Sequence, residues 1–261
     1  MELNFTQFSD TGKPLIILHG LFGNLKNWNW QARELAADFS VYALDLRNHG
    51  ESPHSNAMDY QVMADDVLEF IESNALEEVY LLGHSMGGKV AMQLALDNPH
   101  RVNKLLVADI APVAYGEERG DHENVFDGLM AVDVAELQSR GEAEAALAPH
   151  VAEPAVRQFL VSNLVKDERG GYRWRFNLSV LYHSYDRLRE GVIDSGIFDK
   201  PVLFVKGDNS NYIEKEDWPA IERLFPAARI KTVMGAGHWL HAEKPKVFYK
   251  LARDFFGGGV R

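Results

Sequence analysis

Residues 79–90 read Val-Tyr-Leu-Leu-Gly-His-Ser-Met-Gly-Gly-Lys-Val, an apolar run that passes through a Gly-x-Ser-x-Gly turn into a helical pattern. An apolar run without alternation indicates a buried parallel strand. The glycines at 83 and 87 allow a turn too sharp for side chains, which is the context that a nucleophile elbow requires. We therefore expect Ser85 to lie exposed at the start of a helix, where the helix dipole and the free Met86 N–H favour an oxyanion.

Short apolar runs of the same kind recur along the chain and end near glycine or aspartate, at 15–18, 41–44, 105–108, 202–205 and 230–233. Several of the stretches between them have helical periodicity. Alternating strands and helices predict an α/β fold with a mostly parallel sheet flanked by helices. Ligands of such sheets bind at the carboxyl ends of the strands, so chemistry is expected there.

The alternation stops between Pro112 and Phe198, where helical stretches are punctuated by glycine and proline. We interpret residues 112–198 as a helical cap subdomain inserted into an α/β core made of 1–111 and 199–261. A second independent domain is the alternative. The insertion is favoured because strand-like runs resume after it and the chain closes with an amphipathic helical pattern.

Composition narrows the function. The 261 residues are 46% hydrophobic and 25% charged, as in ordinary globular proteins. The net charge of −11 argues against nucleic-acid or anionic-membrane partners, which favour basic patches. The absence of cysteine excludes disulfides, a thiol nucleophile and thiolate metal sites. No apolar run approaches the roughly 20 residues of a membrane span. Residues 1–10 lack the pattern of a signal peptide, so we expect a cytoplasmic protein; its oligomeric state is not predicted.

A phosphate-binding loop is the competing interpretation of the glycine-rich turn, because residues 83–89 also fit G-x-x-x-x-G-K. A phosphate-binding loop needs serine or threonine next, to hold magnesium, and the chain has Val90. No apolar run ends in an acidic pair of Walker B character. We therefore favour the nucleophile and expect neither a metal nor a cofactor.

A serine nucleophile needs a base to take its proton. His238 follows the last strand-like run in Gly235-Ala236-Gly237-His238, and glycines let that loop approach Ser85 closely. His241 is the rival and is interpreted as structural. In the order Ser, acid, His, two aspartates at strand ends qualify as the acid, Asp109 and Asp208.

The second half of an oxyanion hole is expected from the loop His19-Gly20-Leu21-Phe22-Gly23, which follows the first apolar run. The backbone N–H of Leu21, rather than that of Phe22, is expected to face the substrate carbonyl oxygen together with Met86.

These motifs, together with 45–52 and 235–239, resemble those of α/β hydrolases from about residue 14 to the end of the chain. Three runs are similar to bacterial YbfF-type esterases in particular: 109–112, 174–177 and 209–212. Most relatives carry an aspartate three residues after the glycine at 207, where this chain has Ser210, and Asp208 falls two residues early. The resemblance implies that Asp109 is the acid and that Ser210 is an auxiliary hydrogen-bond partner.

The expected function is a serine carboxylesterase that hydrolyses short- to medium-chain acyl esters, or thioesters, through an acyl-enzyme. Small-molecule esters would be its partners. Aromatic side chains in or near the cap are expected to line the substrate pocket: Phe22, Trp174, Tyr182 and Trp239. Two alternatives remain open, a cofactor-free perhydrolase or haloperoxidase and a non-catalytic ligand-binding relative; the intact serine, histidine and acid argue against the second.

Overall fold

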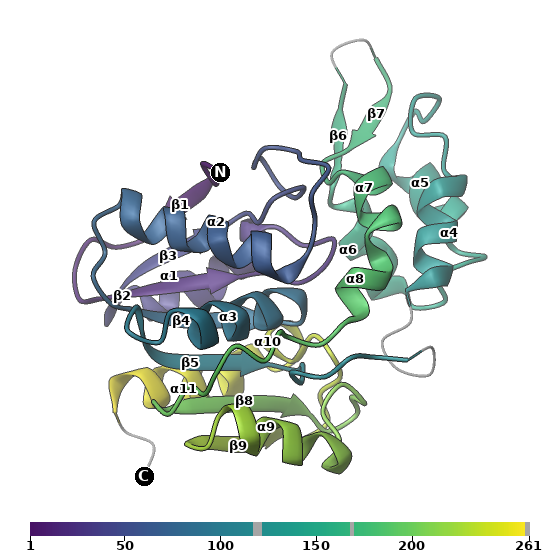
Figure 1. Cartoon of the computed structure of the whole chain (residues 1–261). Helices are drawn as coiled ribbons and strands as arrows, with labels where there is room; N and C mark the ends of the chain where they lie inside the picture. Colours follow the sequence, from purple (N-terminus) through teal and green to yellow (C-terminus); the bar gives the residue numbers. More distant parts are fainter. Residues whose placement is uncertain (117–121, 168–169, 259–261) are drawn as a thin grey trace.

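A seven-stranded sheet forms the centre of the computed structural model, which describes residues 1–116, 122–167 and 170–258 (Figure 1). The strands follow the order β1-β3-β2-β4-β5-β8-β9. Only the pairing of β1 with β3 is antiparallel. The bounds are β1 (Phe5–Gln7), β2 (Lys13–Leu18), β3 (Phe39–Leu44), β4 (Val79–His84), β5 (Val102–Ala108), β8 (Val202–Gly207) and β9 (Ala228–Val233).

The mostly parallel sheet predicted from the apolar runs is confirmed, and each of the six runs lies in a parallel strand. The sequence did not predict β1. Its three residues are polar or exposed, so the segment carries no apolar signal and takes its strand conformation from pairing with the edge of β3.

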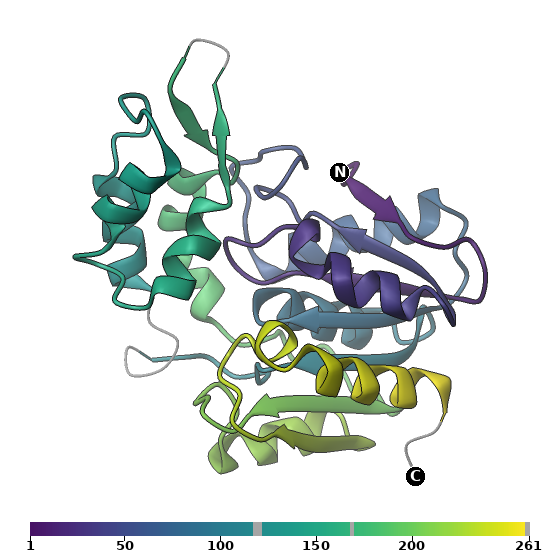
Figure 2. The ribbon, with the colours of Figure 1, turned by 180° about the vertical axis from the view of Figure 1, so that it is seen from behind.

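Helices cover both faces of the sheet (Figures 1 and 2). One face carries α2 (Tyr60–Ser73), α3 (Met86–Asp97) and α9 (Trp218–Leu224), which follows η2 (Lys215–Asp217). The other face carries η1 (Leu25–Trp28), α1 (Asn29–Leu35), α10 (Leu240–Glu243) and α11 (Pro245–Gly257).

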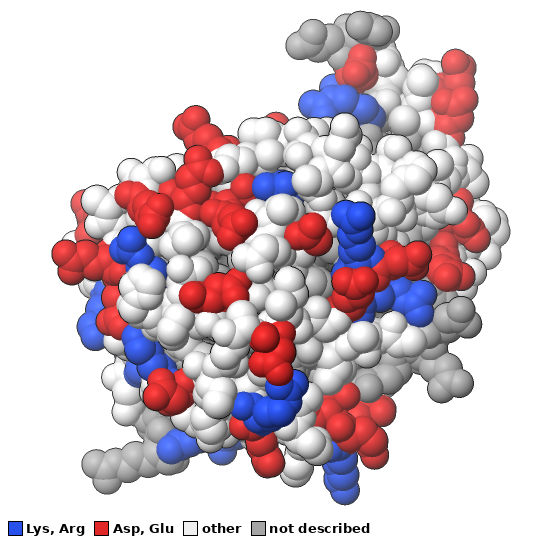
Figure 3. Space-filling view, in the orientation of Figure 1, with Lys and Arg blue, Asp and Glu red and all other residues white. Residues whose placement is uncertain are grey.

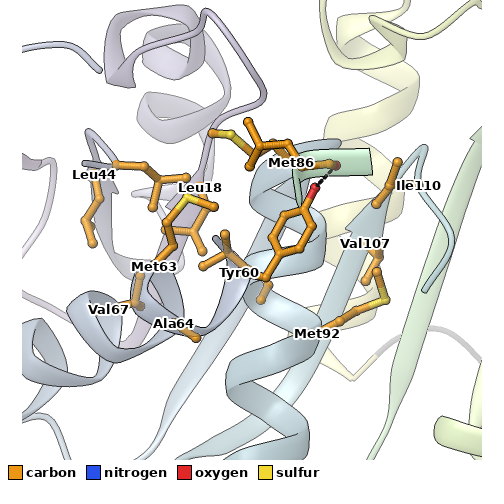
Figure 4. Packing of buried hydrophobic residues seen from close by; sticks show 14 of the residues in the cluster. Leu18, Leu44, Tyr60, Met63, Ala64, Val67, Met86, Met92, Val107 and Ile110 are labelled. Carbon is orange, nitrogen blue, oxygen red and sulfur yellow. Dashed lines mark hydrogen bonds between the residues drawn. The ribbon is translucent and has the colours of Figure 1, made fainter. Parts of the chain in front are cut away.

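Each face has its own hydrophobic core because successive strand residues point to opposite sides. Ile16 and Leu18 of β2 pack in the core with α2 and α3, part of which Figure 4 shows. Leu15 and Ile17 of the same strand pack in the core with α1 and α11. The two cores hold β4 and β5 rigidly between them, and these strands end at the site described below.

Between β5 and β8 the chain folds over the carboxyl ends of the strands (Figure 1). The segment lies within the range 112–198 expected for the cap. Besides helices it contains an antiparallel hairpin, which the sequence did not predict because its strands have three residues each and are half polar. Its elements are α4 (Glu123–Ala131), α5 (Arg140–Leu147), α6 (Pro154–Val161), β6 (Leu164–Lys166), β7 (Tyr172–Trp174), α7 (Leu178–His183) and α8 (Tyr185–Arg189).

Asparagine side chains tie this cap to the core. Asn163 is fully buried and donates from Nδ2 to the carbonyl oxygen of Phe22 at 2.8 Å. Its Oδ1 accepts a hydrogen bond from Asn24 Nδ2 at 2.9 Å. The backbone N–H of Asn177 donates to the carbonyl oxygen of Asn48 at 2.8 Å. Asn163 and Asn24 are buried, so breaking their hydrogen bonds would leave unsatisfied polar atoms, and these bonds hold the cap over the sheet.

Acidic side chains gather over α2 on the face that Figure 3 shows, in keeping with the net charge of −11. In the part of the chain that the structure describes, no helix combines the length and the apolar character needed to cross a bilayer.

Candidate active site

The turn from β4 into α3 holds Ser85 in a conformation that is rare for a residue with a side chain. Its φ is 52° and its ψ is −121°. A Cβ atom added to Gly83 would lie 2.2 Å from the carbonyl oxygen of Gly87, and one added to Gly87 would lie 2.5 Å from that of His19. Both positions therefore require glycine, and the strained turn aims Ser85 away from the strand.

The prediction that Ser85 is exposed needs correction. Only 8% of the residue is exposed, because the cap covers the end of the sheet. Ser85 instead lines a cavity beneath the cap, through which a ligand would reach it.

His238 lies in the turn that follows β9 and joins two groups by hydrogen bonds. Its Nε2 is 3.0 Å from Ser85 Oγ, and its Nδ1 is 2.8 Å from Asp109 Oδ2. A carboxylate can only accept, so Nδ1 carries the proton and Nε2 is free to accept one from the serine. The ring of Tyr212 stacks on the imidazole with centroids 3.9 Å apart. The imidazole is thus held in the orientation and tautomer of a general base.

Asp109 is fully buried at the end of β5, with a φ of 54°. Its Oδ1 accepts from the backbone N–H of Gly207 at 2.8 Å. Its Oδ2 accepts from the hydroxyl of Ser210 as well as from His238. Three donors around one buried carboxylate compensate its loss of hydration.

The alternative acid lies elsewhere. Asp208 is exposed, and its Oδ2 accepts from the backbone N–H of Gly235 at 3.3 Å. The rival histidine is also apart from the serine: the ring of His241 stacks on Trp28 with centroids 4.2 Å apart. Burial lowers the pKa of His241 to about 3, and the neighbouring His238 adds to this effect. A neutral, stacked imidazole is a packing residue.

Leu21, in the loop after β2, lines the same cavity as Ser85. Among the described residues, none accepts a hydrogen bond from the Leu21 N–H, whereas the Phe22 N–H donates to His49 Nε2 at 3.2 Å. Met86 is the first residue of α3, so its N–H has no partner within the helix. The two donors expected for an oxyanion, Leu21 and Met86, are therefore the available ones.

Two buried histidines shape this loop. His49 Nδ1 donates to the carbonyl oxygen of Arg47 at 2.9 Å, which leaves Nε2 to accept from Phe22. Burial lowers the pKa of His49 to about 3, and the nearby His19 lowers it further. His19 Nε2 accepts from the Leu46 N–H at 3.0 Å in the same way. Sequence reasoning assigned His49 no role; the Asn-His-Gly stretch that contains it was the available signal.

A cavity of about 370 Å³ opens from Ser85 and His238 toward the cap. Phe22 and Trp239, both expected as substrate-binding residues, line it. Sequence reasoning did not identify the apolar residues of α4 and α6 that line this cavity. Val125 comes from α4, and Val156, Phe159 and Leu160 come from one face of α6, where they recur at helical spacing.

The structure does not bring Trp174 or Tyr182 to the cavity. Trp174 stacks on Phe176 at 5.4 Å with an interplanar angle of 8°, and Phe176 packs against Phe22. Tyr182 is 47% exposed, and its ring meets Phe126 edge to face. Both aromatics pack the cap rather than line the cavity.

A second, smaller cavity of about 40 Å³ lies on another side of Ser85. Met86, Ile110 and Tyr60 contribute to its wall. Over residues 1–116, 122–167 and 170–258, no group of three or more histidine, aspartate or glutamate side chains is arranged to hold a metal ion.

Comparison with known proteins gives the class. The family described as alpha/beta hydrolase fold matches residues 13–245. Esterase YbfF of Escherichia coli (strain K12) is 36% identical over 98% of this chain and 99% of its own length. The sn-1-specific diacylglycerol lipase ABHD11 of Mus musculus is 39% identical over 98% of this chain and 84% of its own. A solved structure titled marine microorganism esterase superposes with a TM-score of 0.95 at 41% identity, over 97% of this chain and 99% of that one.

The chain therefore belongs to the α/β-hydrolase family. Esterases at 36% and 41% identity that match nearly its whole length make it a carboxylic ester hydrolase. The fold and the resemblance to YbfF-type esterases inferred from the sequence are both confirmed.

Proposed function

We propose that this esterase works through a triad of Ser85, His238 and Asp109. The observation that carries the proposal is the continuous line of hydrogen bonds, 3.0 Å from Ser85 Oγ to His238 Nε2 and 2.8 Å from His238 Nδ1 to Asp109 Oδ2. Asp208 makes no such contact with the imidazole, which supports Asp109 as the acid.

In the first half of the reaction, Ser85 Oγ attacks the ester carbonyl carbon as His238 takes its proton. The N–H groups of Leu21 and Met86 stabilise the oxyanion, worth about 3–4 kcal/mol of transition-state free energy per donor. When the intermediate collapses, His238 Nε2 gives the proton to the leaving oxygen, or to sulfur in a thioester. Asp109 keeps its charge and stabilises the imidazolium, while Ser210 holds Asp109 in position.

In the second half, a water molecule attacks the acyl-enzyme and transfers its proton to His238 by the same route. Ser85 is then regenerated and the carboxylic acid leaves. The chemistry is supplied by the side chains and backbone N–H groups named above.

We propose esters with short- to medium-chain acyl groups as its substrates, because the cavity beneath the cap that adjoins Ser85 is of small-molecule size and has a mostly apolar lining. Thioesters react by the same steps. Because one relative is named a diacylglycerol lipase, a diacylglycerol belongs among the substrates tested.

The test is hydrolysis of p-nitrophenyl esters from acetate to palmitate, and of a short-chain thioester and a diacylglycerol, by the wild type and by Ser85→Ala. We expect activity on short or medium chains that falls in the variant by on the order of 10⁶-fold in kcat. Activity that survives in Ser85→Ala would overturn the assignment of the nucleophile.

A further inference from the structure

Two cavities meet at Ser85, and they differ in size and in what lines them. The large lobe is the 370 Å³ cavity beneath α4 and α6. The small lobe is the 40 Å³ cavity, whose wall includes Tyr60, Ile110, Tyr115, Tyr185 and Leu188. Four residues line both lobes, so the lobes adjoin at the reacting carbon: Leu21, Ser85, His122 and Tyr212.

The position of the base distinguishes the lobes chemically. The leaving oxygen of an ester must take its proton from His238 Nε2. Of the residues that the structure describes, His238 and Trp239 line the large lobe and neither lines the small one. Met86, whose N–H is a proposed donor to the oxyanion, lines the small lobe. The leaving alcohol therefore belongs in the large lobe and the acyl chain in the small one.

The small lobe limits the length of the acyl chain. Its 40 Å³ is about three times the ~10–15 Å³ that one water molecule needs. That space admits one to three carbon atoms beyond the carbonyl carbon, as in acetyl to butyryl groups.

Hydrogen bonds make the end of the small lobe rigid. The hydroxyl of Tyr60 donates to the carbonyl oxygen of Leu188 at 2.5 Å. Figure 4 shows Tyr60 near Met86, with a dashed hydrogen bond from its hydroxyl. The hydroxyl of Tyr115 donates to the carbonyl oxygen of Tyr212 at 2.6 Å and accepts from the Ala111 N–H at 2.7 Å.

The ammonium of Lys89 adds to this rigidity. It is completely buried, lies 5.2 Å from the ring centroid of Tyr60 and 4.7 Å from that of Tyr115, and donates to the carbonyl oxygen of Glu190. Moving either tyrosine to admit a longer chain would break buried hydrogen bonds and the contacts of the ring with the Lys89 side chain.

We propose that the preferred substrates are esters of a short acid with a bulky, apolar alcohol. This inference rests on the proposed function. The bond that forms joins Ser85 Oγ to the short acyl carbon, and the bond that breaks releases the alcohol into the large lobe with the proton from His238. Val125, Val156 and Phe159 supply the apolar surface on which the alcohol packs.

Two isomeric esters test the proposal directly. Octyl acetate has a short acyl group and a long alcohol, and ethyl octanoate has the reverse, at the same composition and nearly the same hydrophobicity. We expect kcat/KM to be at least about tenfold higher for octyl acetate. Equal kcat/KM values for the two isomers, or a higher value for ethyl octanoate, overturn the two-lobe assignment but leave the proposed esterase mechanism unaffected. Failure to hydrolyse either isomer or any p-nitrophenyl ester overturns the proposed function as well.

Substitutions in each lobe test which lobe holds the acyl chain and which holds the alcohol. Leu188→Ala enlarges the small lobe and is expected to raise the ratio of ethyl octanoate to octyl acetate hydrolysis by several-fold. Val156→Phe narrows the large lobe and is expected to lower octyl acetate hydrolysis relative to ethyl acetate. Val247→Phe is the control, because Val247 is 50% exposed on α11 and lines neither lobe.

Each readout is a ratio of two substrates on one preparation, so it does not depend on the fraction of folded enzyme. Ile110→Val is a milder enlargement of the small lobe for the case that Leu188→Ala does not fold. Ratios that stay at the wild-type value in all three lobe variants overturn the proposal.

Discussion

His84 Nε2 donates a hydrogen bond to the backbone carbonyl oxygen of His238 at 2.9 Å. The residue that precedes the proposed nucleophile therefore holds the loop that carries its proposed base. Burial lowers the pKa of His84 well below its usual value, and His241 and His238 lower it further. His84 is thus neutral, so it donates this bond without adding a positive charge next to the imidazolium that forms during catalysis.

This relationship predicts different effects for two substitutions of His84. His84→Phe removes the donor and is expected to lower kcat by about tenfold, equivalent to ~1.4 kcal/mol, with little change in KM. His84→Gln keeps an N–H donor and is expected to retain most of the activity. Steady-state kinetics on a p-nitrophenyl ester compares the two variants. An equal loss of kcat in both would show that the hydrogen bond from His84 does not contribute to catalysis.

The acid of the triad is tested by a matched pair of isosteric changes. Asp109→Asn is expected to lower kcat by up to about 10⁴-fold, because the amide favours the wrong tautomer of His238. Asp208→Asn, at an exposed position with one hydrogen bond at 3.3 Å, is expected to leave the rate nearly unchanged. A near-normal rate for Asp109→Asn would contradict the assignment.

Ser210 supports Asp109 and does not touch the reacting atoms. Ser210→Ala removes one donor from the buried carboxylate, while the Gly207 N–H remains at 2.8 Å. A hydrogen bond to a charged group contributes about 1.5–3 kcal/mol, so we expect a roughly tenfold to hundredfold fall in kcat, smaller than that for Asp109→Asn. Ser210→Thr keeps the hydroxyl and should recover much of the loss. A loss in Ser210→Thr as large as in Ser210→Ala would count against the hydrogen bond.

Stability is expected to fall as the pH drops below about 6.5. The pKa of His49 and that of His241 are each about 3 in the folded chain, lowered chiefly by burial. The unfolded chain therefore binds more protons between pH 6.5 and 3, and the free energy of unfolding decreases by on the order of 1.4 kcal/mol per pH unit for each histidine. Urea unfolding at pH 7.5 and pH 5.0 measures the difference.

The substitution His241→Phe tests how much His241 contributes to this pH dependence of stability. His241 Nδ1 has no hydrogen-bond partner among the described residues, and the ring stacks on Trp28, so phenylalanine can take its place. We expect the loss of stability between pH 7.5 and pH 5.0 to shrink by about 2 kcal/mol in this variant. An unchanged loss would mean that His241 is not the titrating group.

The sheet, which is confirmed, and the assignment of Ser85 as nucleophile, which stays a prediction, both follow from strong local signals. Six apolar runs without alternation read as buried strands, and Gly83 and Gly87 mark a turn that only glycine can make. The choice between Asp109 and Asp208 could not be made from local pattern, since both follow strands. It depends on where each carboxylate points once β5 and β8 pair, and only the family resemblance favoured Asp109.

The cap was predicted least well, for a physical reason. Trp174 and Tyr182 carry the residue types of a pocket wall, but Trp174, at the end of β7, stacks on Phe176, and Tyr182 of α7 lies at the surface. Which face of a short helix meets a cavity is decided by its neighbours. The apolar spacing of Val156 and Phe159 was visible in the sequence, yet nothing local showed that this face covers Ser85.

Acyl-enzyme trapping tests the central claim most directly. The wild type is mixed with excess p-nitrophenyl acetate, quenched in acid within the first turnovers and digested for peptide mass spectrometry. The account predicts a burst of p-nitrophenol equal to the enzyme concentration and a single acetylated peptide, modified on Ser85, which is absent from Ser85→Ala. An acetyl group found on another residue, or hydrolysis of the same ester by Ser85→Ala at the wild-type rate, would contradict it.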